Sequence, residues 1–568
     1  MKALTRDDRI RQKLYAPEAS KERAVKAHCL PFSQIPHTTR LFTDFLAYSP
    51  GVRPFYPHSP YFNEWMKAQP FALEYDSARR EQVSAILERQ NKSWNGSPQT
   101  LGNIERLRRG ACAVVTGQQV GLFGGPMFAL YKALSAVKLA EEATTAGVEA
   151  VPVFWLATSD HDLSEVNHVS LPGPDGMLRT LTAPSHGVSD SPVSDVRLGD
   201  EILPVVDEAA TLLGDSELSQ FLREAYLPGE SLGSAFARLF VRLFASRGVI
   251  LLDASDAELH RLAAPMYRGA IERAADLEAT LLARGEALEK AGYHQQVKVT
   301  PSSVLLFTIR HGSRTPIHRQ AKGWAQDSEF VIGSESDAEK ISAAELLQRI
   351  EESPENFSPN VLLRPVVQDY LLPTLAYTGG AAEVAYFGQS GAVYEMLLGR
   401  VTPIVPRFSA TIIEPKVQRW LRQYDITVRD AFHDAAALRQ KLAERALPEG
   451  VQAAFDAAQR SVETSLGELR KSLEQLDSTL VGASQTAESK INYQLDRLRQ
   501  LASSAELRRS EVISRHAQAI SEALYPNGAL QERGVAGIYF LAREGTELLQ
   551  MISDAMHTDC HDHQILEL

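Results

Sequence analysis

Two short apolar runs flank an amphipathic segment in the first third of the chain, and polar residues follow each run. Residues 112–116 and 151–157 are apolar enough to form buried strands, and residues 127–144 have the spacing of a helix. Strand, helix and strand in alternation predict a parallel sheet with crossover helices. Since ligands bind at the carboxyl ends of such strands, the polar residues that follow both runs are predicted to share one site.

The same alternation returns further along the chain. An amphipathic helix over 232–247 leads to an apolar strand over 249–252 that ends at Asp253, which predicts a third strand end near the first two. The pattern resumes with apolar strands at 361–365 and 373–380, and the second of these carries glycines where a strand should turn into a helix.

A different pattern separates these units. Between 292 and 332, β-branched runs at 297–300 and 304–308 are broken by Gly and Pro, so we expect a small antiparallel insertion. After Pro415 the strand signals nearly vanish. Apolar residues then recur every three or four positions over 451–480, which is the signature of a helix with a narrow apolar seam.

The helical seam is interrupted at Gly482, and a second seam follows through Ile491, Leu495 and Leu498. Two long helices joined near Gly482 predict an antiparallel hairpin. Each seam is then buried either against the other or against a second subunit, and the pattern leaves both arrangements open.

These patterns predict an α/β fold with a parallel-sheet core, inserted connecting segments and a long C-terminal antiparallel α-helical coiled-coil arm. The predicted divisions are an N-terminal wrapping segment (1–110), the first part of the core (111–290), an inserted mixed segment (291–357), the second part of the core (358–415), the arm (416–524) and a C-terminal segment that returns to the core (525–568).

Composition narrows the classes of function. The 568 residues include 59 basic and 71 acidic side chains, a net charge of −12, and no long Lys/Arg run, so we expect no nucleic-acid partner. Cys29, Cys112 and Cys560 are too scattered for a disulfide framework or a metal site. The charged N-terminus and the lack of a long apolar run predict a cytoplasmic protein without a membrane span.

A glycine-rich loop joins the first strand to its helix and suits an anionic ligand, because glycine lets the backbone approach closely and a helix N-terminus favours negative charge. It matches neither the Walker loop nor the dinucleotide fingerprint. Glycines that merely permit tight packing are the structural alternative. The candidate binding residues from this region are Thr116, Gly117, Gln118, Gln119, Gly124, Gly125 and, on the helix, Lys132. Lys132 either meets a carboxylate or phosphate or is solvated.

Ionisable groups crowd the end of the next strand. Asp160, His161 and Asp162 are the candidate catalytic residues, with one carboxylate as general base and His161 as proton shuttle. Asn167 and His168 are candidate binding residues just beyond them. Two alternatives remain: a metal-dependent hydrolase built on the Asp-His-Asp cluster, and a structural role in which Asp162 or Ser164 caps a helix.

A second cluster is predicted on the far part of the sheet. An Arg side chain can hold a carboxylate through two hydrogen bonds, which makes Arg364 and Arg407 candidate ligands of a dicarboxylate or an amino acid. Internal salt bridges are the alternative for both. The other candidate binding residues of this cluster are Gly379, Gly380, Glu383, Tyr386 and Gln389.

The chain resembles the cysteine-adding enzymes of bacillithiol synthesis, the BshC family. The matching stretches span nearly the whole chain in order: 30–40, 115–132, 152–168, 358–369, 379–389 and 525–533. The resemblance implies a Rossmann-type core with inserted connecting segments, and a coiled-coil arm that pairs two subunits into a homodimer. It also implies the final pathway step, in which cysteine is joined through an amide bond to the amino group of glucosaminyl-malate.

Residues fit this reaction in several ways. A sugar amine needs a base, for which Asp160, His161 and Asp162 are candidates, and free amides of the glycine loop suit the oxyanion of the cysteinyl carbonyl. The cations Lys132, Arg364 and Arg407 suit the carboxylates of malate, whereas Gln118, Gln119 and Asn167 suit sugar hydroxyls. These residue roles are expectations that follow from the resemblance.

Activation of the cysteine carboxylate is left open. Amide formation in water needs a leaving group, which ATP normally supplies, yet the His-x-Gly-His and Lys-Met-Ser-Lys-Ser motifs of class I synthetases are absent from the sequence. ATP is therefore an open cosubstrate, and no metal is expected. Besides the metal-dependent hydrolase, a non-enzymatic coiled-coil scaffold is the remaining alternative.

Overall fold

A five-stranded parallel sheet forms the centre of the structure, a computed structural model that describes residues 26–69, 75–184, 191–320, 329–333, 338–509, 511–558 and 560–568. Across the sheet the strands are β13 (Ile404–Pro406), β12 (Thr374–Gly379), β2 (Cys112–Gln118), β3 (Ala150–Leu156) and β6 (Ile250–Asp253). All neighbours are parallel, so the five carboxyl ends lie along one edge. The strand order reverses between β2 and β12, and at such a reversal an open α/β sheet binds its ligands.

The first predicted units are confirmed. The expected strands at 112–116, 151–157 and 249–252 are β2, β3 and β6, and the expected helix at 127–144 is α7 (Phe128–Thr145), which packs on β2 and β3. The strand predicted from 373 onward is β12, and helix α16 (Ala381–Leu398) follows its glycines.

The strand predicted at 361–365 is wrong. Arg364 begins a helix there, α15 (Arg364–Leu371), and the Asn360 side chain accepts hydrogen bonds from the amides of Leu362 and Leu363, both at 3.0 Å. A short buried apolar run fits a helix start as well as a strand, and Pro365 in the first turn favours the helix because its fixed φ suits that position.

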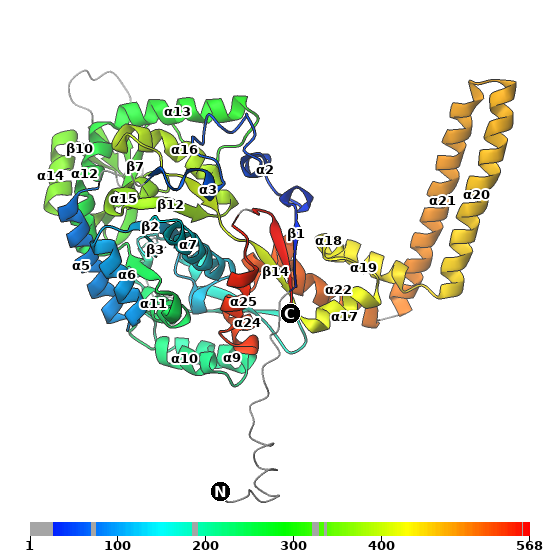
Figure 1. Ribbon diagram of the computed structural model, residues 1–568, viewed down its shortest axis with the longest axis horizontal. Helices are drawn as coiled ribbons and strands as arrows, with labels where there is room; N and C mark the ends of the chain where they lie inside the picture. Colours follow the sequence, from blue (N-terminus) through cyan, green and yellow to red (C-terminus); the bar gives the residue numbers. More distant parts are fainter. Residues whose placement is uncertain are drawn as a thin grey trace, which may run out of the picture.

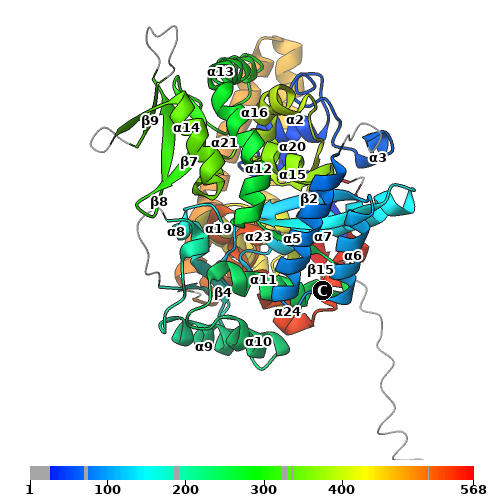
Figure 2. The same ribbon diagram turned by 90° about the vertical axis from the view of Figure 1, so that its left-hand side faces the viewer.

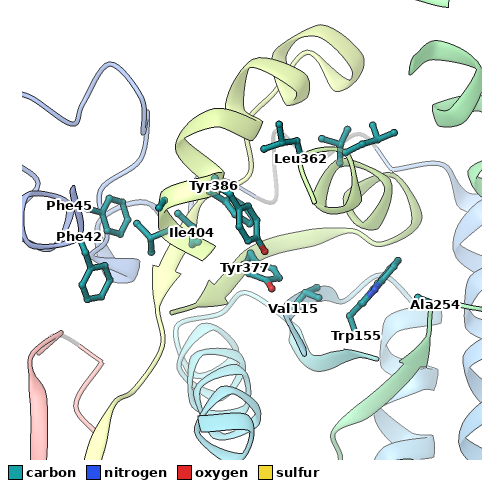
Figure 3. Packing of buried hydrophobic residues seen from close by; sticks show 14 of the residues in the cluster. Phe42, Phe45, Val115, Trp155, Ala254, Leu362, Tyr377, Tyr386 and Ile404 are labelled. Atoms are coloured by element: carbon teal, nitrogen blue, oxygen red, sulfur yellow. The ribbon is translucent and has the colours of Figure 1, made fainter. Parts of the chain in front are cut away.

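Both faces of the central sheet are covered, as a parallel sheet requires. Alternate residues of β3 face opposite sides: Val153 and Trp155 join one buried cluster, and Phe154 and Leu156 join another. Figure 3 shows part of the first cluster, in which Trp155 lies near Val115 and the rings of Tyr377 and Tyr386 lie close together. The cores on the two faces fix the positions of the strand ends.

The predicted insertion is confirmed as an antiparallel sheet. Its strands, in order across the sheet, are β10 (Glu339–Ser342), β9 (Glu329–Ile332), β8 (Ser313–Arg319), β7 (Ser303–Arg310) and β11 (Phe357–Pro359). Figure 2 shows this sheet at one side of the core, next to helices α12 (Ala257–Glu272) and α14 (Ala343–Glu352). The β-branched run at 297–300 forms no strand. Residues 321–328 and 334–337 of the predicted insertion lie outside the described residues.

The N-terminal and C-terminal segments meet in a third sheet. Strand β15 (His563–Glu567) lies between β1 (Lys26–Leu30), to which it is antiparallel, and β14 (Ala410–Ile413), to which it is parallel (Figure 1). Further along, Tyr56 donates a hydrogen bond to the carbonyl of Val384 at 2.7 Å, so the N-terminal segment packs against α16. Residues 1–25 and 70–74 of the predicted wrapping segment, and residue 559 of the C-terminal one, lie outside the described residues.

A helical hairpin projects from the body as the predicted arm (Figure 1). Its helices are α20 (Glu449–Leu476) and α21 (Leu480–Arg509), which pack against each other. The turn lies between them, where Asp477 accepts hydrogen bonds from the amide and hydroxyl of Thr479, and Gly482 lies inside α21, so the predicted break is displaced. Among helices of the described residues, none combines the length and apolar composition that a bilayer span requires.

Candidate active site

An open cleft of about 430 Å³ lies at the carboxyl ends of β2, β3 and β12, where the strand order reverses. Loop residues of the insertion, Gln296 and Val297, contribute to its wall. The complete lining is Gly117, Gln118, Gln119, Lys132, Trp155, Ala157, Glu165, Gln296, Val297, Val361, Arg364, Tyr377, Ala382, Glu383 and Tyr386. Residues of the glycine-rich loop and residues of the second predicted cluster therefore meet in one cleft.

The floor network of the cleft is built from Lys132, Tyr377, Gly380 and Glu383. The ammonium group of Lys132 lies 2.7 Å from Glu383 Oε2, and the two side chains are 5% and 13% exposed. Lys132 also donates to the carbonyl of Gly117 at 2.7 Å and to Gln118 Oε1 at 2.8 Å. Glu383 accepts from the Tyr377 hydroxyl at 2.5 Å and from the Gly380 amide at 2.8 Å. The three N–H groups of Lys132 are thus directed at protein acceptors.

Burial and pairing act against each other in this network. Burial lowers the pKa of Lys132 to about 8, although Glu383 opposes the shift. For Glu383, burial alone would raise the pKa, but Lys132 and its other hydrogen-bond donors outweigh burial and hold the pKa below its usual value. The sequence predicted Lys132 as a ligand of the substrate or as a solvated cation. The solvated alternative is wrong, since the side chain is buried. The carboxylate that Lys132 meets is that of Glu383, and a role in substrate binding stays a prediction.

Arg364 is the cation of the cleft with hydrogen-bonding capacity to spare. It donates to Gln368 Oε1 at 3.1 Å and to the Tyr386 hydroxyl at 2.9 Å, and it lies over the ring of Tyr377. A guanidinium group has five N–H donors, so some remain for an anion in the cleft. Burial raises the pKa of Tyr386, which keeps its hydroxyl protonated.

Two glycines of the glycine-rich loop, Gly124 and Gly125, do not offer free amides to an anion. The amides of Gly124 and Gly125 donate to the carbonyls of Gly121 and Leu122 at 3.1 and 2.9 Å, and the loop packs below the sheet against helix α11 (Leu232–Leu243). Positive φ angles of 87° and 69° explain why glycine stands at both positions. Gly124 and Gly125 therefore fit the packing alternative, because their amides are occupied and neither residue lines the cleft. Gly117, Gln118 and Gln119 of the same loop do line the cleft, and their role in binding stays a prediction.

Three other predicted binding residues contact other parts of the protein and have a structural role. Thr116 is fully buried and donates to the carbonyl of Thr378 at 2.8 Å. Gln389 exchanges two hydrogen bonds with the backbone of Val297, at 2.8 and 2.9 Å, and so fixes the cleft wall from behind. A Cβ on Gly379 would lie 2.9 Å from the Glu383 side chain, so this glycine permits the close approach of Glu383.

Arg407 forms an internal salt bridge, which was the alternative reading of this residue. It contacts both carboxylate oxygens of Glu532, at 2.6 and 3.1 Å, and the two side chains are 7% and 2% exposed. Burial alone would raise the pKa of Glu532, but Arg407 together with His563 and Ser409 outweighs burial and lowers the pKa below its usual value. Arg407 does not line the cleft, so the prediction that it binds substrate there is wrong.

The predicted catalytic residues lie at the rim of the cleft. Gln119, which lines the cleft, donates to Asp160 Oδ2 at 2.9 Å, so the ends of β2 and β3 do converge. Asp162 instead caps helix α8 (Leu163–Val166): it accepts from the Glu165 amide at 3.2 Å and from the Ser164 hydroxyl at 2.6 Å. Capping was the structural alternative for Asp162, and this geometry supports it.

Two further residues of the predicted cluster do not reach the cleft. His168 is exposed at the start of β4 (His168–Pro172), and its Nδ1 lies 2.9 Å from the carbonyl of Ser164. The carbonyl of Asn167 accepts from the amide of Ala183 at 2.7 Å, and neither residue lines the cleft. The described residues contain no group of three or more His, Cys, Asp or Glu side chains placed to hold a metal ion, so the hydrolase alternative gains no support.

Two functional candidates were missed by sequence reasoning. Glu165 lines the cleft, and its carboxylate has no hydrogen-bond partner within the described residues. Arg314, on β8 of the insertion, is 8% exposed and contacts both Asp160 and His161, at 3.2 and 3.1 Å. Glu165 stood next to the predicted cluster, whereas no local pattern connects Arg314 to residues more than a hundred positions earlier. We call Gln119, Asp160, His161 and Arg314 the rim cluster.

Comparisons with known proteins cover the chain almost end to end. Residues 25–408 match the family model described as "Bacillithiol biosynthesis BshC, N-terminal Rossmann-like domain", and residues 410–568 match the one for its C-terminal coiled-coil domain. A protein of Koribacter versatilis is 48% identical over 540 residues, 95% of this chain and 99% of that protein. A protein of Solibacter usitatus is 36% identical over 95% of this chain and 99% of that protein. A protein of Geobacillus thermodenitrificans is 27% identical over 94% of this chain and 98% of that protein. All three carry the name "Putative cysteine ligase BshC".

Proposed function

Because the chain belongs to the BshC family of bacillithiol biosynthesis, we propose that it is a ligase that joins the carboxyl group of L-cysteine to the amino group of glucosaminyl-malate. The product of this reaction is bacillithiol. The observation that supports the proposal most is the cleft at the strand-order reversal, which combines the guanidinium of Arg364 with the unpaired carboxylate of Glu165. Neither the metal-dependent hydrolase nor the coiled-coil scaffold has an observation in its favour.

Arg364 is the proposed ligand of the malate carboxylates. Its contacts with Gln368 and Tyr386 hold the guanidinium plane in place, and a planar, pre-oriented guanidinium suits a carboxylate that binds through two oxygens. Gln118, Gln119 and the Tyr386 hydroxyl lie around it and offer hydrogen bonds to sugar hydroxyls. The floor network positions these groups and takes no part in the reaction.

Glu165 is the proposed proton acceptor. The amine must lose a proton as its nitrogen forms the new C–N bond, and a general base has to lie within reach of that proton. Asp160 already accepts from Gln119, from the His161 amide and from Arg314, whereas the Glu165 carboxylate carries no such contact in the described structure. In this proposal the base is thus Glu165, and Asp160 orders the rim.

The assay uses the full chain with L-cysteine, glucosaminyl-malate and ATP, and detects bacillithiol by mass spectrometry. We expect product only when all three are present, because a free carboxylate needs a leaving group before an amine displaces it. Product formed without ATP would show that ATP is not a cosubstrate, but the proposed joining of cysteine to glucosaminyl-malate would stand. Absence of product, together with normal bacillithiol in a strain that lacks the gene, would overturn the function.

We also propose that the arm pairs two copies of the chain. Apolar side chains remain exposed along the hairpin even though α20 and α21 pack together: Leu498 is 55% exposed and Leu501 is 61% exposed. A second copy would cover this surface. Leu498→Lys with Leu501→Lys should weaken the dimer at least about tenfold by light scattering. The control Leu203→Lys changes a leucine of the body that is 44% exposed, and it should leave the dimer affinity unchanged.

A further inference from the structure

Arg314 brings three separate segments together at the rim of the cleft. Its side chain is 8% exposed and lies over the ring of Phe307. It donates to the Ser358 hydroxyl at 2.9 Å and to the carbonyl of Pro359 at 2.8 Å, both on β11. The same NH1 group donates to Asp160 Oδ1 at 3.2 Å and contacts His161 Nδ1 at 3.1 Å. The insertion therefore holds the residues that follow β3.

This contact decides which nitrogen of His161 carries the proton. A guanidinium group has only donors, so Nδ1 of His161 must accept and must hold a lone pair. In a neutral imidazole the proton then lies on Nε2. Asp160 Oδ1, 3.3 Å from Nδ1, would suit the opposite tautomer, but this oxygen already accepts hydrogen bonds from Arg314 and from the His161 amide.

The Nε2–H group is available to a ligand. It has no hydrogen-bond partner within the described part of the chain, and the His161 side chain is 34% exposed. Its neighbour Asp160 is tied to Gln119, which lines the cleft. A fixed donor with an open end at the edge of a cleft is the arrangement that stabilises a developing negative charge.

We propose that His161 is a hydrogen-bond donor through Nε2–H to the oxygen that gains negative charge during acyl transfer, and that Arg314 is the positioning residue that fixes this tautomer. This inference rests on the proposed function. It replaces the role of proton shuttle that the sequence suggested for His161, and it takes the place of Gly124 and Gly125, whose amides are occupied, as the oxyanion donor.

In this acyl transfer step, His161 neither gains nor loses a proton. The amine lone pair forms the C–N bond, and the carbonyl π electrons move onto the oxygen that Nε2–H contacts. These electrons then return as the C–O bond breaks between the cysteinyl carbonyl carbon and the phosphoryl group that ATP has supplied, so that phosphate or AMP leaves with the electron pair, and the amine proton goes to the carboxylate base. His161 ends the step in the state in which it began.

Three variants of His161 separate a donor from a shuttle. His161→Phe keeps the ring but removes the donor, and kcat should fall about 10²–10³-fold with little change in KM. The amide N–H of His161→Gln lies near the position of Nε2, so this variant should retain much more activity than His161→Phe. His161→Asn places its amide near Nδ1 and should behave like the Phe variant. Wild-type activity in His161→Phe, or equal loss in the Gln and Phe variants, would overturn the inference.

The tautomer is measured without turnover by NMR of protein labelled with ¹⁵N-histidine, with the His161 signals assigned from their loss in His161→Gln. We expect a protonated Nε2 and an unprotonated Nδ1, and we expect Arg314→Met to mix the two tautomers while Arg310→Met, on neighbouring β7, leaves them unchanged. A proton on Nδ1 in the wild type would overturn the inference even if bacillithiol is made. An inactive wild type with the expected tautomer would instead count against the proposed function alone.

Discussion

The floor network and the rim cluster, which meets the cleft through Gln119, differ in how completely their hydrogen bonds are satisfied. On the floor, Lys132 has three protein acceptors and Glu383 has three donors, and both side chains are nearly buried. At the rim, His161 is about one-third exposed and has an open N–H, and nearby Glu165 is exposed with a carboxylate that no side chain or backbone group of the described residues contacts. A satisfied buried network rigidifies a site, whereas open groups are the ones that can meet a substrate.

The largest effect is expected on the floor. Lys132→Met leaves the Glu383 carboxylate buried without its cation, and removing one partner of a buried pair costs about 3–5 kcal/mol of the free energy of unfolding. Urea denaturation measures this loss. Lys138→Met, on the same helix but partly exposed, is the matched control and should change stability by less than about 1 kcal/mol.

A double variant sharpens this test. Glu383→Gln in the Lys132→Met background removes the stranded charge, so it should restore part of the lost stability. If Lys132→Met alone is as stable as the wild type, the floor is no structural network and Lys132 becomes a candidate substrate ligand again.

At the rim, substitution should affect turnover and leave stability alone. Glu165→Gln removes the proposed base, and loss of a general base typically lowers kcat about 10²–10⁴-fold. Stability should stay within about 0.5 kcal/mol because the side chain is exposed. The matched control is Asp162→Asn, which removes one negative charge from the same short helix and should keep most of the activity.

The outcome would contradict the assignment if Asp162→Asn lost activity and Glu165→Gln did not. The base would then be Asp162, as one reading of the sequence suggested, and its cap contacts would have to open in the complex. Wild-type activity in both variants would exclude both carboxylates as the base.

The contrast between satisfied and open groups extends to a buried histidine behind the floor. His563 lies between the hydroxyls of Ser409 and Thr411, each at 2.8 Å, and burial lowers its pKa to about 4 although Glu532 opposes the shift. The unfolded chain therefore binds a proton between about pH 6.5 and 4 while the folded chain does not. Stability falls as the pH is lowered through this window, and it does not fall further from this group below about pH 4.

Chemical denaturation at several pH values measures this dependence. The contribution of His563 should be about 3 kcal/mol between pH 6.5 and 4, and His563→Gln should flatten the curve in that window. His168→Gln, at an exposed histidine, should leave the curve as it is. An unchanged slope in His563→Gln would mean that this histidine is protonated in the folded protein.

Local patterns predicted the fold better than the site. Periodicity predicted the parallel units, the antiparallel insertion and the helical arm, because each depends on neighbours in sequence. It failed at residues 361–365, where the side chain of Asn360 decides between helix and strand. It also displaced the arm turn, since Gly482 is tolerated inside a helix.

Site prediction failed where function depends on what a side chain contacts. Six of the predicted binding residues line one cleft, although the sequence had placed them in two separate groups: Gln118, Gln119, Lys132, Arg364, Glu383 and Tyr386. The chemical state of Lys132 and Arg407 was not predictable, because their partners Glu383 and Glu532 come from distant segments. The contact of Arg314 with His161 likewise depends on the tertiary fold alone.

The smallest effect should come from the cap at Asp162. Asp162→Ala removes the side-chain oxygen that accepts from the Glu165 amide, and loss of such a cap costs about 1 kcal/mol. Asp162→Asn keeps an oxygen there, and Asn caps about as well as Asp, so its stability should match the wild type. Both variants are compared by urea denaturation. Since Glu165 lies on the capped turn, Asp162→Ala should also lower kcat a few-fold by loosening the proposed base, whereas equal and severe losses of activity in both variants would mean that the carboxylate of Asp162 itself takes part in the reaction.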